Sequence, residues 1–204
     1  MHHQLPAGLF VCRHLVLVAA FLVTARQGDE FHRQAPRFGG GMAVQAGYVS
    51  LENSAGWFDG PMLGLGGRLH VYLPGPFRVG GGGASVRLSY GHDGVDDSEV
   101  RIGYGGMTAE LTHRISTWRF SAGMLAGGGR YRNVHVLSKE RGGTANVLLD
   151  NRTTFLLAPL VTFEYMVSPA ISLMAMADFL WGPDLGERRH LGGPKLHAGI
   201  LFNR

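Results

Sequence analysis

The sequence predicts an all-β chain that folds as one closed, up-and-down antiparallel β-barrel of about eight strands. Three observations predict it. Apolar residues alternate with small or polar residues in eight stretches after residue 40, long and short connections alternate between those stretches, and no stretch has the length of a transmembrane helix. Strands of ten to twelve residues, tilted about 45°, would cross an apolar layer of about 25 Å, so the barrel is predicted to be transmembrane.

Composition favours one exported domain. The 204 residues suffice for a single domain. Lys139 and Lys195 are the only lysines among 19 basic residues, whereas the water-facing surface of a soluble β-protein is normally rich in Lys and Glu. The formal net charge is only +4 and the arginines are scattered, so nucleic-acid binding is not expected.

The N-terminus has the pattern of a signal peptide. Arg13 precedes an apolar run at 15–23, and Ala25 closes a Val-x-Ala cleavage site. The run is too short for a transmembrane helix; a buried N-terminal helix and a misplaced start codon are the alternatives. We expect a signal peptide at 1–25, a short linker at 26–39 and the barrel at 40–204. Removal of the signal peptide would also remove Cys12, the single cysteine.

Eight stretches have the period of two that half-buried strands show. They cover residues 42–48, 63–73, 77–90, 100–111, 118–124, 154–165, 171–181 and 196–202. In the third, the run 80–83 breaks the parity as a β-bulge would, which places Val86 and Leu88 on the apolar face and Arg87 on the polar face. The fourth stretch resumes on shifted parity after 105–106.

The connections between the stretches alternate in length. Short turns are predicted at 74–76, 114–117 and 167–170, and longer connections at 51–61, 91–99, 133–151 and 182–194. All the longer connections then fall at one end of the sheet, as in transmembrane barrels, whose short turns are periplasmic and whose longer loops are external. The barrel must be closed, because the N–H and C=O groups of an edge strand would find no partner in lipid.

Aromatic residues fall near the ends of strands, where a transmembrane barrel carries interfacial girdles. Near the short turns these are Phe77, Trp118 and Tyr165, and near the longer connections Tyr48, Tyr90, Phe155 and Trp181. A scatter of core aromatics is the alternative. Val161, Ala175 and Ile200 are expected to face lipid near the middle of the membrane.

Two segments resemble parts of a known class of protein. Residues 163–173 look like a strand–tight turn–strand unit, and 196–202 looks like the C-terminal strand that barrel-assembly machinery recognises, although Asn203 and Arg204 follow its last aromatic residue. On these patterns, residues 40–203 resemble the small bacterial outer-membrane β-barrel superfamily, the type of the OmpA transmembrane domain and OmpX. The resemblance implies a fold and the bacterial outer membrane as location, and no particular activity.

Isolated charges on the polar face are the candidate site residues. They are Arg68, Arg87, Arg101, Glu110, Arg119, Glu164 and Asp178. Inside a narrow barrel such charges must pair or meet water, so we expect a structural salt-bridge network that plugs the lumen. An ion or proton pathway is the alternative. No spacing identifies a catalytic residue, a cofactor site or a metal site, and none is assigned.

The predicted function is that of an integral outer-membrane barrel with a structural, adhesive or minor transport role, and not of an enzyme. The alternatives are a soluble exported lipocalin-like barrel around a small hydrophobic ligand and a lipid-modifying enzyme at the barrel rim. Expected partners are outer-membrane lipid, barrel-assembly machinery and a protein that contacts 133–151. Two apolar runs around Gly142 and Gly143 predict that this segment extends above the membrane as a hairpin.

Overall fold

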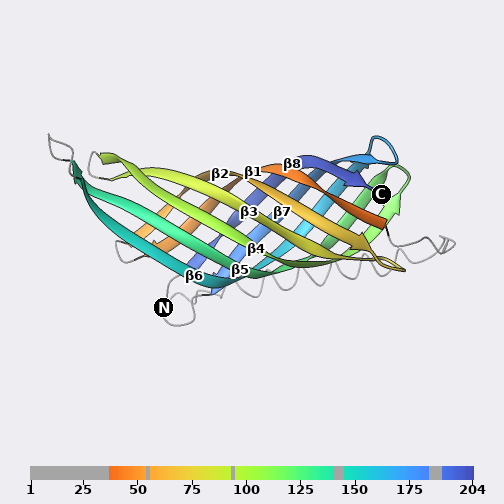
Figure 1. Ribbon diagram of the computed structural model, residues 1–204, viewed down its shortest axis with the longest axis horizontal. Coiled ribbons are helices and arrows are strands. Elements are labelled where there is room, and N and C mark those ends of the chain that lie inside the picture. The colour runs from red at the N-terminus through yellow and green to blue at the C-terminus, as the bar shows by residue number, and fades with distance from the viewer. Residues whose placement is uncertain (1–36, 54–55, 93–94, 140–144, 184–189) are drawn as a thin grey trace, which may run out of the picture. The chain divides into compact units, whose positions relative to one another are not determined.

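The computed structural model describes residues 37–53, 56–92, 95–139, 145–183 and 190–204. These residues form a closed barrel in which each strand pairs antiparallel with its neighbours in the chain and the first strand pairs with the last (Figure 1). The strands are β1 (Arg37–Asn53), β2 (Gly56–Tyr72), β3 (Phe77–His92), β4 (Val95–Ile115), β5 (Trp118–Lys139), β6 (Ala145–Met166), β7 (Ile171–Pro183) and β8 (His190–Asn203). The predicted all-β closed barrel of eight strands is confirmed.

The part of the chain predicted as signal peptide, including Cys12, lies outside the described residues, as does most of the linker. Strand β1 begins at Arg37, within the segment predicted as linker. Among the described residues, no helix is long and apolar enough to cross a membrane.

The two ends of the barrel differ, and we call the end that carries the residues 73–76, 116–117 and 167–170 the turn end, and the opposite end the distal end. At the turn end, Gly75 has φ 92°, a conformation that glycine adopts without strain and that closes the turn between Pro74 and Pro76. Closure of the barrel continues to the last residue, because the N–H of Phe38 donates to the carbonyl of Arg204 at 3.0 Å.

The predicted longer connections consist mainly of strand. In the clearest case, β5 and β6 remain paired from Val134–Leu149 to Lys139–Ala145, beyond the last β4–β5 pair at Glu99–Val134. The strand pairing predicted for the hairpin at 133–151 is therefore confirmed for the backbone of 133–139 and 145–151; residues 140–144 and the side chains of 135–150 lie outside the description. The pairing of β5 with β6 therefore continues farther toward the distal end than the pairing of β5 with β4 or of β6 with β7.

The predicted bulge at 80–83 and the parity shift at 105–106 are wrong. Strands β3 and β4 pair without a register shift from Phe77–Leu111 to Tyr90–Ser98, and Gly83 lies directly opposite Gly105. The backbone keeps its parity, and the apolar residues change sides instead. Phe77 and Val79 lie on the outer surface, whereas Val86 and Leu88 are buried inside.

The register also gives the tilt of the strands. Directly paired residues lead once around the barrel, through Val161, Ala177, Leu196, Ala46, Leu63, Arg87, Arg101, Arg132 and Asn151. Asn151 lies ten residues nearer the distal end than Val161 in the same strand (161 − 151). A stagger of this size in a barrel of eight strands requires a tilt of about 40°.

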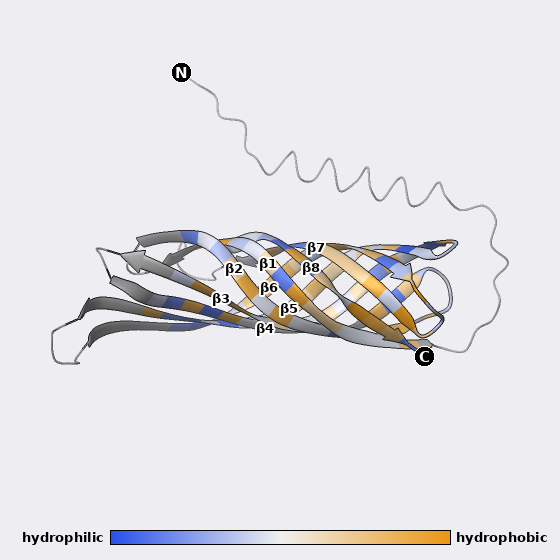
Figure 2. Ribbon diagram, turned by 90° about the horizontal axis from the view of Figure 1, so that it is seen from above, coloured by the Kyte–Doolittle hydropathy of each residue, from blue (hydrophilic) through white to orange (hydrophobic). Residues whose placement is uncertain are grey.

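The outer surface carries an apolar layer next to the turn end. On β5 the outward residues run from Trp118 to Gly128 without a charge, and Arg130 and Arg132 follow. Ten residue steps of about 3.3 Å, tilted about 40°, span about 25 Å, which is the height of the apolar band of an outer-membrane barrel. Figure 2 shows the hydrophobic stretches on the part of the barrel nearer the C-terminus.

The residues predicted as girdles border this layer. At the turn end Phe77, Trp118 and Tyr165 are on the outer surface, and the rings of Trp118 and Tyr165 are 4.9 Å apart. At the other border Tyr48, Phe155 and Trp181 are exposed; the side chain of Tyr90 is not among those described.

Arginine in place of Ala175 should destabilise the barrel by about 2–4 kcal/mol, because Ala175 faces outward in the middle of the apolar layer, directly opposite Phe163 and Ala198. Equilibrium unfolding in urea in the presence of lipid vesicles measures the effect. Ala175→Leu is the control and should be nearly neutral. Equal stability of the two variants would place Ala175 outside lipid.

Candidate functional site

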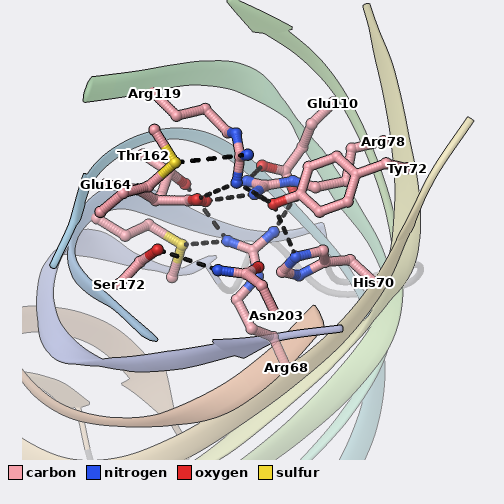
Figure 3. Close-up of polar contacts among 12 residues, drawn as sticks. Arg68, His70, Tyr72, Arg78, Glu110, Arg119, Thr162, Glu164, Ser172 and Asn203 are labelled. Carbon is pink, nitrogen blue, oxygen red and sulfur yellow. Dashed lines mark hydrogen bonds and ion pairs between the residues drawn. The ribbon is translucent and has the colours of Figure 1, made fainter. Parts of the chain in front are cut away.

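Five side chains from five strands form a charged cluster inside the barrel near the turn end (Figure 3). Arg68, Arg78 and Arg119 lie on β2, β3 and β5, and Glu110 and Glu164 lie on β4 and β6. Arg78 contacts both glutamates, one with each terminal nitrogen. Arg68 forms the second ion pair of Glu110. Arg119 forms the second ion pair of Glu164, with 2.9 Å between a terminal nitrogen of Arg119 and Oε2 of Glu164. We call this chain of alternating charges the lower cluster.

Aromatic and hydroxyl groups surround the lower cluster. The Tyr72 hydroxyl accepts hydrogen bonds from Arg119 and, at 3.4 Å, from Arg78, and the Arg119 guanidinium lies 4.5 Å from the centre of the Tyr72 ring. His70 packs edge-on against the same ring, with its Nε2 3.1 Å from the hydroxyl. Arg68 donates to Thr162 at 3.3 Å. The cluster is thus held from several sides.

The lower cluster is buried and fully paired. The side chains of Arg78, Glu110 and Glu164 are fully buried, with 0% exposure. Each carboxylate has two arginine partners, so moving one group would leave another charge buried and unpaired, which is costly. This geometry suits a structural role.

A second group of polar side chains, the middle cluster, lies toward the distal end. Asp178 accepts from His197 at 2.8 Å and lies 3.1 Å from Nζ of Lys195. Lys195 also donates to the Tyr104 hydroxyl, which in turn donates to Gln45 at 3.2 Å. The ammonium of Lys195 lies 3.9 Å from the centre of the Tyr104 ring. The side chain of Lys195 is fully buried, so this lysine depends on Asp178 for its counter-charge.

Buried charged side chains lie in the part of the lumen nearer the turn end, beside a small apolar cluster of Ala43, Met174 and Leu201. Most buried side chains nearer the distal end are apolar, although Ser98 and Asn133 are also buried there. A cavity of about 40 Å³, with room for a few water molecules, lies between the lower and middle clusters and is lined by Arg68, Thr108 and His197 among others. Beyond the middle cluster the interior is filled by an apolar plug. The plug consists of Val49, Met62, Val86, Leu88, Val100, Ile102, Tyr104, Leu125, Tyr131, Leu156, Ala158, Leu160 and Leu180.

A larger hollow opens at the turn end. It has a volume of about 600 Å³ and is lined by Tyr72, Arg119 and Arg204, so it reaches the lower cluster. The polar part of the lumen is therefore approached from the turn end and ends at the plug. Within the described part of the chain, no three His, Cys, Asp or Glu side chains are grouped so that they could hold a metal ion.

Five of the seven candidate residues lie inside the barrel. Four of them, Arg68, Glu110, Arg119 and Glu164, belong to the lower cluster, and Asp178 to the middle cluster. Arg87 and Arg101 do not, and their placement in the lumen was wrong. They lie on the outer wall and pair with Glu99. The reason is that the outer wall at their level lies beyond the apolar layer and faces water.

Four buried charged or imidazole side chains are not among the candidate residues: His70, Arg78, Lys195 and His197. A signal existed for Arg78, since it stands between the outward Phe77 and Val79 and alternation places it inside. The same alternation around Leu196 places Lys195 and His197 inside. Their partners come from other strands, and the pairing could not be deduced without the register.

An apolar outer layer, a closed sheet and charged side chains confined to the lumen behind that layer together define a small transmembrane β-barrel, the class found in bacterial outer membranes. No protein-family model and no curated protein sequence matches the chain. Solved structures of this class do match it, and the predicted resemblance to the small outer-membrane barrels is confirmed at the level of the fold.

Three of these structures illustrate the likeness. Neisserial surface protein A has a TM-score of 0.56 at 13% identity, covering 83% of this chain and 99% of its own. OprG from Pseudomonas aeruginosa has a TM-score of 0.54 at 9% identity, covering 86% and 99%. Ail, the attachment invasion locus protein of Yersinia pestis, solved with the heparin analogue sucrose octasulfate, has a TM-score of 0.50 at 14% identity, covering 82% and 99%.

Proposed function

We propose that the chain is an integral outer-membrane protein that does not conduct ions or solutes and that has a structural or adhesive role at its distal end. The observation that carries this proposal is the apolar plug. Water-filled channels have a polar wall throughout, whereas here Leu88, Ile102 and Leu180 belong to one buried apolar cluster in the lumen, each with at most 3% exposure. An ion that entered from the turn end would have to cross this apolar region without water.

The soluble lipocalin-like alternative fits the molecule poorly. It would need its apolar residues inside, around a cavity large enough for a ligand. Here large apolar side chains such as Leu69, Met107 and Leu196 are on the outer wall, each more than two-thirds exposed. The apolar part of the lumen is packed, and the cavity beside it holds about 40 Å³.

The adhesive part of the proposal rests on the distal end. The β5–β6 hairpin continues to the Lys139–Ala145 pair, beyond the strands that flank it, and so offers backbone edges on which a partner could add a strand. We therefore keep 133–151 as the proposed contact segment for a protein. The likeness to Ail, a protein named for attachment and invasion, supports a role at the cell surface.

Planar lipid bilayers test the absence of conduction. We expect no current steps from the purified barrel, whereas a general porin measured beside it gives large steps. A gel shift between unboiled and boiled samples shows that the inserted protein is folded. Cell fractionation shows whether the protein is found in the outer-membrane fraction. Porin-sized current steps from folded protein would show that the plug does not close the lumen, and transport would then be the better-supported function.

A further inference from the structure

Four arginines form a patch on the outer wall that the proposed function does not use. They are Arg87 on β3, Arg101 on β4, and Arg130 and Arg132 on β5. Arg87 lies directly opposite Arg101, and Arg101 directly opposite Arg132, so three of them form a row across neighbouring strands. The side chains of Arg87 and Arg101 are each 57% exposed. We call these four residues the arginine patch.

The arginine patch surrounds a hollow. A space of about 450 Å³ on the outer wall is lined by Arg101, Arg130 and Arg132, with Gly103 and Asn151. Gly103 forms its open floor, since a Cβ added there would meet no atom within 4 Å. Nε of Arg130 donates to Asn151 at 2.7 Å, which holds one wall of the hollow in place.

The patch keeps an excess of positive charge. Glu99 pairs with Arg87 at 2.9 Å and also with Arg101, and so offsets one of the four charges. Among the carboxylates whose side chains the structure describes, none forms an ion pair with Arg130 or Arg132. Guanidinium groups are suited to phosphate because they can donate two parallel hydrogen bonds to its oxygens.

The position of the patch indicates what kind of anion meets it. Arg130 follows the last outward residue of the apolar layer on β5, at the border where lipid headgroups lie. Below the patch, four outward glycines are directly paired across β2 to β5. They are Gly67, Gly83, Gly105 and Gly128. This glycine row leaves the wall smooth, so acyl chains can lie against the backbone underneath a headgroup held by the arginines.

We propose that the arginine patch binds a phosphorylated, acylated glycolipid of the outer leaflet, with a phosphate in the hollow and acyl chains along the glycine row. The inference rests on the proposed location of the barrel in the outer membrane, with its distal end outward. It deepens that function by giving one side of the barrel, β3 to β5, a defined lipid partner. Binding there would fix the orientation of the barrel against its neighbouring lipids.

Binding of bis-phosphorylated lipid A to the folded, detergent-solubilised protein tests the proposal. We expect the variant Arg130→Gln/Arg132→Gln to bind this probe about tenfold more weakly. The reason is that each arginine near a charged lipid surface adds an electrostatic attraction, and the loss of two such attractions raises the Kd by about this factor. The matched control is Arg114→Gln/Arg204→Gln at the turn end, which removes the same charge and should bind as the unmodified protein does. Gel shifts confirm that each variant is folded.

Glu99→Gln gives a change in the opposite direction. Loss of this carboxylate frees Arg87 and Arg101, and we expect binding several-fold tighter than that of the unmodified protein. A gain that depends on the lipid A phosphates cannot result from apolar surface exposed by poor folding. Lipid A without phosphates should bind weakly to all variants.

Three outcomes would overturn the inference. They are unchanged binding by Arg130→Gln/Arg132→Gln, equal binding of dephosphorylated lipid A, and binding of sucrose octasulfate with the same arginine dependence when lipid A does not bind. The last would assign the patch to a soluble polyanion. If the folded protein fractionates with the outer membrane and fails these tests, only this inference falls and the proposed function stands.

Discussion

Replacing Glu164 by glutamine should lower the free energy of unfolding by about 3–5 kcal/mol, because it leaves two arginines inside the barrel without their shared counter-charge. Glu164 is fully buried and pairs with both Arg78 and Arg119. Glutamine keeps the volume, so the loss measures charge rather than packing. Urea unfolding of the barrel in lipid vesicles, followed by tryptophan fluorescence, gives the difference.

Glu99 provides a control with the same number of partners. It pairs with Arg87 and Arg101, yet its side chain is 23% exposed and its partners are 57% exposed. Water and salt screen such a pair, so Glu99→Gln should cost less than about 1 kcal/mol. Similar losses for Glu99→Gln and Glu164→Gln would mean that bulk water reaches the lower cluster, and the lumen would then be wider than its packing indicates.

Much of the fold could be predicted because a barrel repeats one simple pattern. Alternation places every second side chain on the same wall, and the turns at 73–76, 116–117 and 167–170 carry the Gly, Pro and Ser residues expected of tight turns. The strand ends at the distal side were harder. Residues 51–53 and 56–61 were interpreted as part of a connection, yet they pair as strand.

The interior could be predicted only in part, for a physical reason. Within the apolar layer the outer wall faces lipid and the lumen holds charges, whereas beyond it the outer wall faces water and the lumen is packed with apolar side chains. The same strand therefore shows Val79 outside and Leu88 inside with no change in backbone parity. If apolar residues are assumed to face lipid along the whole strand, the change of the apolar face from the outer wall to the lumen is mistaken for a bulge. The same assumption places Arg87 and Arg101 in the lumen instead of on the outer wall.

Individual partners needed the register. Arg78 and Glu164 are 86 residues apart in the chain, and they meet because β3 and β6 face each other across the lumen. Local spacing carries no information about such a contact. The net excess of positive charge in the lower cluster, from three arginines and two glutamates, also follows only when its members are known.

Asp178→Asn should cost about 3–5 kcal/mol, and more than Lys195→Met, because the two partners of this buried pair are not equivalent. Asp178 has two cationic or hydrogen-bonding neighbours, Lys195 at 3.1 Å and His197 at 2.8 Å. Removing Lys195 leaves Asp178 bound to His197, whereas removing Asp178 leaves the ammonium of Lys195, among the described side chains, with the hydroxyl and ring of Tyr104.

The double variant Asp178→Asn/Lys195→Met distinguishes a dry pair from two solvated groups. If the pair is dry, methionine removes the stranded charge and fills similar volume, so the double variant should be more stable than Asp178→Asn alone. Unfolding free energies of the four proteins in the cycle, measured in the same vesicles, give the coupling. Additive losses would mean that Lys195 and Asp178 are hydrated separately. Because the plug begins directly beyond these residues, water at this level would also weaken the case that the barrel is closed to ions.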